Sequence, residues 1–118
     1  MLIKNFLETE GIYEKSHGGQ GKVRTAVIFG RNDFETNISF ILFTEIPPGS
    51  SIGYHPHGQD EEIFVILEGN GILTTGSEEI HVSVGDIIIN QVGQSHGLVN
   101  RSSSSIKLLV FQVMKPLG

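Results

Sequence analysis

Short apolar runs, each closed by a turn signal after about ten residues, constrain the fold of this chain more than any other feature. Residues 38–46 form the most continuous run, and Pro47-Pro48-Gly49 ends it because proline lacks the N–H that a strand ladder needs. Gly69-Asn70-Gly71 indicates a hairpin, since Asn-Gly tolerates the positive φ angles of a type I′ turn. Further strands are expected at residues 23–29, 62–67, 72–75, 79–83, 87–89, 96–100 and 106–114, and around His55 and His57.

About nine or ten short strands without a convincing long helix predict an all-β fold, and the turn spacing is typical of a sandwich or barrel. The length of 118 residues predicts a single domain, residues 1–118. Within it we expect residues 17–113 to form the barrel. Residues 1–16 fit either a short amphipathic helix or an edge strand.

The overall composition excludes several classes of protein. The chain has no cysteine, which rules out a disulfide framework and a cysteine-ligated zinc site. Its net charge of −5 argues against a nucleic-acid partner, because such binding rests mainly on neutralising phosphates. The first residues meet charge too early for a signal peptide, and no run approaches the ~18 apolar residues of a membrane span. We therefore expect a cytoplasmic protein without a membrane partner.

Two histidines and a carboxylate stand close together in the middle of the chain. His55 and His57 are two residues apart, so on an extended strand both side chains project from the same face, about 7 Å apart by rise alone. Glu62 opens the next apolar run and can close a third ligand position if that run folds back beside the first. His96 follows a Gly-Gln-Ser turn downstream. Three imidazoles and one carboxylate predict a mixed nitrogen and oxygen metal site.

These residues resemble the two motifs of the cupin superfamily. The first motif, G-x5-H-x-H-x3,4-E-x6-G, matches Gly49, His55, His57, Glu62 and Gly69, and the second, G-x5-P-x-G-x2-H-x3-N, matches Gly85, Gly93, His96 and Asn100, with Gln91 where the family usually has proline. The resemblance implies a jelly-roll β-barrel, also called a double-stranded β-helix. It covers residues 17–113 and is strongest to small single-domain bacterial cupins labelled oxalate-decarboxylase-like or mannose-6-phosphate-isomerase-like.

Alternation along the strands separates the predicted site residues from their neighbours. Glu62 is preferred over Glu61 because the two face opposite ways and only Glu62 has the motif spacing. The same alternation puts Phe64 and Ile66 on the face of Glu62, and Leu98 on the face of His96, so these three are expected to line an apolar pocket or the core. We expect Asn100 to be a turn or hydrogen-bonding residue, and His17 and His81 to face solvent.

The ligand set leaves the metal and the activity open. Mn, Fe, Ni, Zn and Cu all accept three imidazoles and a carboxylate, and the resemblance favours Mn or Fe. It also implies a metal-dependent enzyme acting on a small oxygen-rich substrate, as a decarboxylase, dioxygenase or isomerase. A non-catalytic module that binds or senses a small ligand is the alternative, and no catalytic residue is assigned.

Two further expectations concern arginines and partners. True oxalate decarboxylases have an arginine at the position of Ile52, which weakens the interpretation of this chain as an oxalate decarboxylase. Arg24 and Arg101 are the other candidates to meet a carboxylate, and the role of Arg24 is open.

Open sheet edges need cover, and the resemblance implies pairing through sheet edges and the N-terminal segment, so a homodimer is expected.

Overall fold

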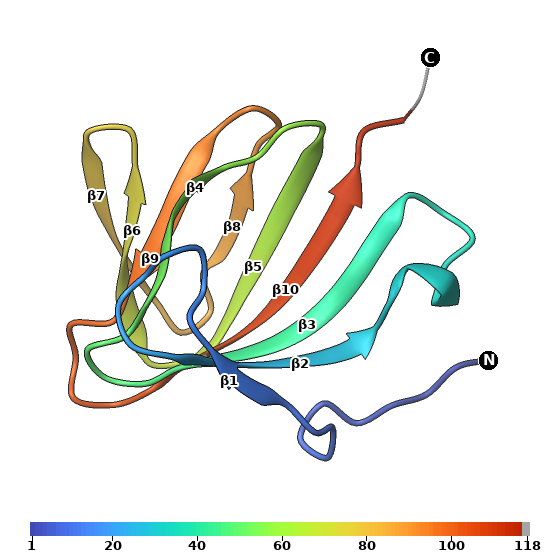
Figure 1. Ribbon diagram of the computed structural model, residues 1–118, viewed down its shortest axis with the longest axis horizontal. Coiled ribbons are helices and arrows are strands. Elements are labelled where there is room, and N and C mark those ends of the chain that lie inside the picture. The colour runs from blue at the N-terminus through green and yellow to red at the C-terminus, as the bar shows by residue number, and fades with distance from the viewer. Residues whose placement is uncertain (117–118) are drawn as a thin grey trace.

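The computed structural model describes residues 1–116 and folds them into two antiparallel sheets (Figure 1). Its elements are β1 (Ile12–Glu14), β2 (Val23–Phe29), the 3₁₀ turn η1 (Arg31–Asp33), β3 (Ile38–Ile46), β4 (Ser51–Pro56), β5 (Asp60–Glu68), β6 (Asn70–Thr75), β7 (Glu78–Ser83), β8 (Ile87–Asn90), β9 (Ser95–Val99) and β10 (Ile106–Met114). The described residues contain ten strands and no α-helix, which confirms the all-β prediction.

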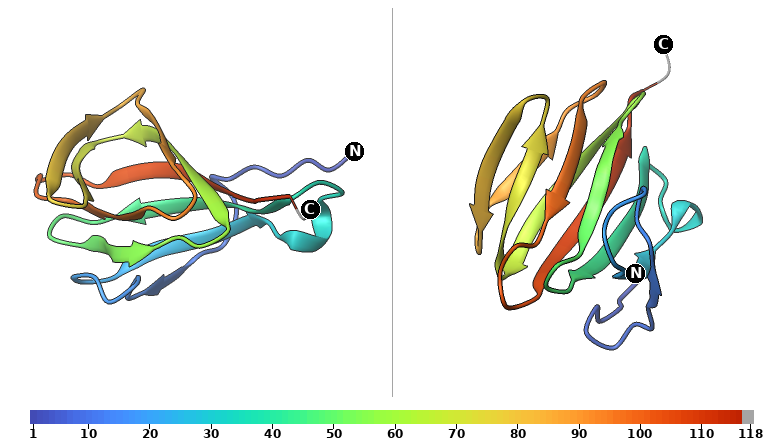
Figure 2. Two further views of the ribbon diagram at one scale, coloured as in Figure 1. Left: turned by 90° about the horizontal axis from the view of Figure 1, so that it is seen from above. Right: turned by 60° about the vertical axis from the view of Figure 1, so that its left-hand side comes forward.

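The two sheets together form a jelly roll, the double-stranded β-helix expected for a cupin. The larger sheet has the strand order β1-β2-β3-β10-β5-β8 and the smaller has the order β4-β9-β6-β7. Figure 2 shows the same strands from two further directions, with the smaller sheet folded over the larger one. Strands next to each other in a sheet are mostly far apart in sequence, so the fold is held by long-range pairing.

The core lies between the sheets and follows the strand alternation. On β5 the inward positions Glu62, Phe64 and Ile66 are buried, whereas the residues between them are half-buried. Phe64, Leu98, Ile106 and other apolar side chains from both sheets make one buried cluster. Each fully buried side chain of this size contributes about 1.5–3 kcal/mol, so the cluster holds the strands that carry the candidate ligands.

The N-terminal segment lies on the outer face of the larger sheet. Ala26, Ile28 and Phe43 form a second buried cluster there, and the Phe6 ring packs against Phe43 with centroids 4.9 Å apart. β2 and β3 thus bury apolar side chains on both faces of the sheet. This explains why residues 38–46 form a continuous apolar run in the sequence. Of the two alternatives for residues 1–16, the edge strand is correct, because β1 pairs with β2.

The hairpin predicted at Gly69-Asn70-Gly71 is wrong. β5 and β6 belong to different sheets, so the chain crosses between sheets at this point. Gly69 makes the corner with a φ of 81°, and a Cβ atom there would collide with the backbone carbonyl oxygen of Ser105. The turn signal at Gly69-Asn70-Gly71 therefore marks the point where the chain changes sheet. β5 and β6 do not pair with each other, because their pairing partners lie elsewhere in the chain.

Asn100 has the hydrogen-bonding role expected of it and closes the loop between β9 and β10. Its side chain is fully buried, and Nδ2 donates to the carbonyl oxygens of Ile46 and Ser104, each at 2.8 Å. Its Oδ1 accepts from the backbone N–H of Ser102 at 3.0 Å. One amide side chain thus satisfies three backbone groups near the core.

Among residues 1–116, no helix is long and apolar enough to cross a membrane. The cytoplasmic location remains a prediction from the sequence.

We expect Asn100→Ala to lower the free energy of unfolding by about 2–3 kcal/mol, because it leaves buried backbone groups without partners. Denaturant unfolding of the purified variant measures this loss. Ser103→Ala, an exposed change in the same loop, serves as the control and should stay within about 0.5 kcal/mol of wild type. A loss as small in Asn100→Ala as in the control would contradict this role.

Candidate metal centre

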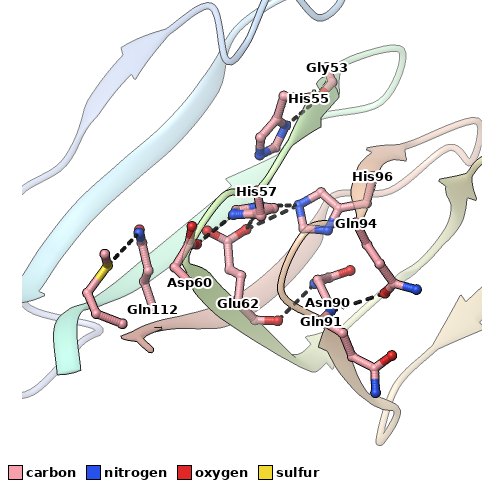
Figure 3. A network of polar contacts seen from close by, with 11 residues as sticks. Gly53, His55, His57, Asp60, Glu62, Asn90, Gln91, Gln94, His96 and Gln112 are labelled. Atoms are coloured by element: carbon pink, nitrogen blue, oxygen red, sulfur yellow. Dashed lines mark hydrogen bonds and ion pairs between the residues drawn. The ribbon is translucent and has the colours of Figure 1, made fainter. Parts of the chain in front are cut away.

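The four predicted ligands come together at one place in the barrel (Figure 3). His55, His57, Glu62 and His96 each offer one ligand atom, and these four atoms lie within 4.8 Å of one another. His55 lies on β4 and is the cross-strand partner of His96 on β9. His57 follows the end of β4, and Glu62 reaches in from β5 of the other sheet. Residues from both sheets therefore build the cluster.

The closest ligand atoms have the spacing that a single ion requires. His57 Nε2 lies 3.0 Å from His96 Nε2, and Glu62 Oε1 lies 3.3 Å from His96 Nε2 and 3.6 Å from His57 Nε2. Metal–ligand bonds of about 2.1 Å place neighbouring ligand atoms about 3.0–3.4 Å apart. His57, Glu62 and His96 therefore have the spacing of ligands to one divalent transition metal, and the ligand atom of His55 lies within 4.8 Å of theirs.

Hydrogen bonds hold two of the rings in the tautomer that a metal needs. The carbonyl oxygen of Gly53 can only accept, so His55 Nδ1–H donates to it at 2.7 Å. His57 Nδ1 lies 2.6 Å from Asp60 Oδ2, with both side chains buried, and its N–H donates to that carboxylate. In the neutral form of each ring, Nε2 then carries the lone pair that is available to a metal, as is typical of metal-ligating histidines.

His96 is the most buried of the four residues, with 2% of its surface exposed. Its Nδ1 has no hydrogen-bond partner among the described residues. Its Nε2 lies 3.0 Å from His57 Nε2, so without a metal one of these two rings can donate a hydrogen bond to the other. A cation bound by His57, Glu62 and His96 would take the place of that proton. This arrangement is the second reason that the residues fit a metal.

The pKa of His55 lies below its ordinary value of 6.5. Burial is the main cause, because it disfavours the charged imidazolium. The hydrogen bond to Gly53 opposes the shift, whereas the nearby rings of His17, His96 and His57 add to it. A lowered pKa keeps His55 neutral near pH 7, which is the form that binds a metal.

A small cavity of about 60 Å³ adjoins the cluster. Its described lining includes His55 and Glu62 from the cluster, the hydroxyls of Thr25 and Thr44, and apolar side chains, among them Phe64. A cavity of this volume holds about four to six groups, each the size of a water molecule. A ligand reaching the cluster through this cavity would be small.

The three residues predicted to line a pocket have different surroundings. Phe64 lines the cavity and also packs within 5.2 Å of the His96 ring, measured between centroids. Ile66 and Leu98 are buried in the same apolar cluster as Phe64. Their part in a ligand pocket stays a prediction.

Two residues near the site were not recognised from the sequence. Asp60 begins β5 on the same face as Glu62, and this shared face is the signal that could have revealed it. His17 was expected to be a solvated loop residue. It is exposed, as expected, yet its ring stacks on His55 with centroids 3.6 Å apart and lines the cavity.

The remaining candidates lie outside the site. His81 is exposed on β7, as predicted. Arg24 donates to the carbonyl oxygen of Thr9 at 2.8 Å and lies 3.8 Å from the Glu45 carboxylate. Arg101 pairs with Glu79 on the surface, and this pairing lowers the pKa of Glu79. None of the described residues that line the cavity is an arginine.

Comparison with known proteins identifies the family. A model described as "Cupin domain" matches residues 42–112. The chain belongs to the cupin family. An "oxalate-binding protein" from Thermotoga maritima is 25% identical to this cupin over 114 residues, covering 97% of this chain and 94% of the relative. An uncharacterized protein from Methanocaldococcus jannaschii is 36% identical over 64 residues, covering 54% of this chain and 51% of that protein.

Solved structures support the fold of this cupin. The crystal structure of a predicted oxalate decarboxylase from Thermotoga maritima superposes with a TM-score of 0.92 at 24% identity, covering 96% of this chain and 99% of that one. The polyketide cyclase RemF from Streptomyces resistomycificus has a TM-score of 0.79 at 19% identity, covering 100% of this chain and 87% of that one. At these identities the likeness shows the shared barrel.

We expect Asp60→Ala to weaken metal binding about tenfold to a hundredfold, because the His57 ring loses the carboxylate that orients it and raises its basicity. Isothermal titration of the metal-free protein with Mn²⁺ measures this change. Glu61→Ala is the matched control, since Glu61 is the neighbouring carboxylate on the opposite face of β5. Equal Mn²⁺ affinity in both variants would contradict an orienting role for Asp60.

Proposed function

We propose that this cupin binds a divalent metal ion through His55, His57, Glu62 and His96 and uses it to hold a small oxygen-rich ligand. The convergence of three imidazoles and one carboxylate within 4.8 Å is the observation that carries the proposal. Buried polar groups of this kind are expensive unless they are paired or coordinate a metal. The favoured ions are Mn²⁺ and Fe²⁺, and Ni²⁺, Zn²⁺ and Cu²⁺ also accept these ligands.

The protein residues around the ion would divide the work between them. His55 and Glu62 belong both to the cluster and to the lining of the cavity, so an ion held there would face the cavity. Gly53 and Asp60 keep their two histidine partners oriented through the hydrogen bonds described above. The bound metal would supply a Lewis acid that attracts ligand oxygens. The apolar walls, including Phe64 and Ile52, would limit water around the ligand.

Oxalate is the first ligand to test. It is small enough for a cavity of about 60 Å³ and offers two oxygens to one metal ion. The relative from Thermotoga maritima is named an oxalate-binding protein. Binding is favoured over decarboxylation because Glu62, a proposed metal ligand, is the one carboxylate among the described lining residues.

A metal-dependent enzyme, such as a decarboxylase, dioxygenase or isomerase, is the second candidate. Two ligand residues facing the cavity favour it, since a substrate there would lie beside the ion. Four protein ligands on a six-coordinate ion leave two positions for a substrate or water, which catalysis requires. The two candidates share the metal site and differ in whether the bound ligand is converted.

Titration with Mn²⁺ and then with oxalate tests the proposal. Metal-free wild type should bind about one Mn²⁺ per chain, and His57→Ala should bind it at least a hundredfold more weakly because a ligand is lost. His81→Ala, which removes an exposed histidine, should behave as wild type. Oxalate should bind the Mn²⁺-loaded protein and not the metal-free protein.

Two results would count against this function. If the wild-type protein binds no divalent metal, the proposed metal site is wrong. If oxalate binds equally well with and without the metal, the metal has no role in holding the ligand. Oxalate that disappears over hours with the loaded wild type, and persists with His57→Ala, would assign the enzyme instead of the binding module.

We further propose that the functional unit is a homodimer. Apolar residues continue across the outer face of the larger sheet, where Ile63 is paired with Ile89 and with Phe111. Ile87 and Ile89 on the edge strand β8 are 67% and 57% exposed. Exposed apolar patches at a sheet edge indicate association, and a second copy would cover them.

Light scattering should give twice the chain mass for wild type and the single mass for Ile89→Glu, because a buried unpaired charge opposes association. Ile80→Glu on β7, an exposed isoleucine of the smaller sheet, is the control and should remain dimeric. A monomeric wild type at working concentration would refute the dimer.

A further inference from the structure

The loop between β1 and β2 carries His17 to the edge of the metal cluster. Three hydrogen bonds tie the loop to β4: Gly53 N–H donates to Ser16 O at 2.9 Å, Ser51 N–H donates to Gln20 O at 3.0 Å, and Gln20 N–H donates to Ser51 Oγ at 2.8 Å. A Cβ atom on Gly53 would collide with the backbone carbonyl oxygen of His17. The loop therefore lies directly on the strand that holds His55, and its position is set by backbone contacts.

His17 has a backbone conformation that is uncommon for non-glycine residues. Its φ is 49°, and it is the one non-glycine residue with positive φ among residues 1–116. L side chains rarely adopt this region, and such residues are found disproportionately at functional sites. The positive φ therefore points to a local constraint on this loop at the position where it meets the cluster.

The His17 side chain lies beside the proposed metal but outside its ligand set. Its ring is nearly parallel to that of His55, at an angle of 7° and a centroid distance of 3.6 Å. It is the one ionisable side chain outside the four-residue cluster among the described residues that line the cavity. A ligand held by the ion in this cavity would therefore meet the His17 imidazole.

The chemistry of an imidazole suits that position. A neutral imidazole always has one N–H donor, whereas the oxygens of a small carboxylate accept hydrogen bonds. The cavity offers hydroxyls from Ser16, Thr25 and Thr44, and no arginine among its described lining residues. Ile52 lines it where the resemblance would have placed an arginine. A carboxylate oxygen pointing away from the ion would thus have His17 as its nitrogen donor.

We propose that His17 is a ligand-binding residue, whose N–H donates a hydrogen bond to an oxygen of a small carboxylate held at the metal. This inference rests on the proposed function, because it needs the ion and its ligand in place. It assigns the β1–β2 loop a part in choosing the ligand. His17 would then act on the ligand directly and leave the affinity for the metal nearly unchanged.

His17→Phe is the sharpest test, because phenylalanine keeps a flat ring that can stack on His55 and removes the N–H donor. For the Mn²⁺-loaded variant we expect oxalate affinity to fall about tenfold to a hundredfold, the loss expected for one hydrogen bond to a charged group. Mn²⁺ affinity, measured on the metal-free variant, should stay within about threefold of wild type. Isothermal titration gives both values, and circular dichroism reports whether the variant folds.

Two further variants make the result interpretable. His17→Asn tolerates a positive φ and retains an N–H donor, so it should keep more oxalate affinity than His17→Phe. His81→Phe makes the same change at an exposed position on β7, and it should bind Mn²⁺ and oxalate as wild type does.

Each other outcome overturns a defined part of the argument. Wild-type oxalate affinity in His17→Phe would overturn the inference and leave the proposed function intact. Equal losses of Mn²⁺ and oxalate affinity in His17→Phe would show that His17 only supports His55, which also overturns it. Loaded wild type that fails to bind oxalate would overturn the proposed ligand and the inference together.

Discussion

The pairing of β4 with β9 is the interaction on which the candidate site depends. It sets His55 opposite His96 across the smaller sheet, and Ile52 opposite Leu98. A slip of one residue in this register would turn His96 to the other face, because strand side chains alternate. The apolar pair therefore does more than fill the core. Together with the irregularity in β4 between Ile52 and His55, it sets two imidazoles from distant parts of the chain on the same side of the barrel.

The larger sheet completes the site, and its buried apolar side chains offset the free-energy cost of burying the polar residues. β5 brings Glu62 to the two histidines of the smaller sheet, and Phe64 and Ile66 on the same face bury apolar area behind it. Burying three imidazoles and a carboxylate is unfavourable on its own. A rigid barrel can hold such a group in place before a metal arrives, which reduces the ordering that binding requires.

The surroundings of the four residues matter as much as the residues themselves. The Asp60 carboxylate and the Gly53 carbonyl act on the Nδ1 sides of His57 and His55, so the Nε2 sides are presented to the cluster. His17 stacks on His55 from a loop that backbone hydrogen bonds tie to β4. The candidate ligands, their orienting groups and His17 thus come from four separate segments that meet only in the folded protein: the β1–β2 loop, β4 with the residue after it, β5 and β9.

The sequence alone determined the fold class and the candidate ligand residues. Strand alternation is a local property, so it placed His55 and His57 on one face and allowed only one of Glu61 and Glu62 to face inward, and the motif spacing selected Glu62. The tertiary structure decided which strands pair, because pairing joins residues far apart in the chain: it showed that Gly69 begins a crossing between sheets and that the β1–β2 loop lies on β4. It also decided the roles of Asp60 and His17, since a hydrogen bond and a ring stack depend on side-chain positions that no spacing in the sequence specifies.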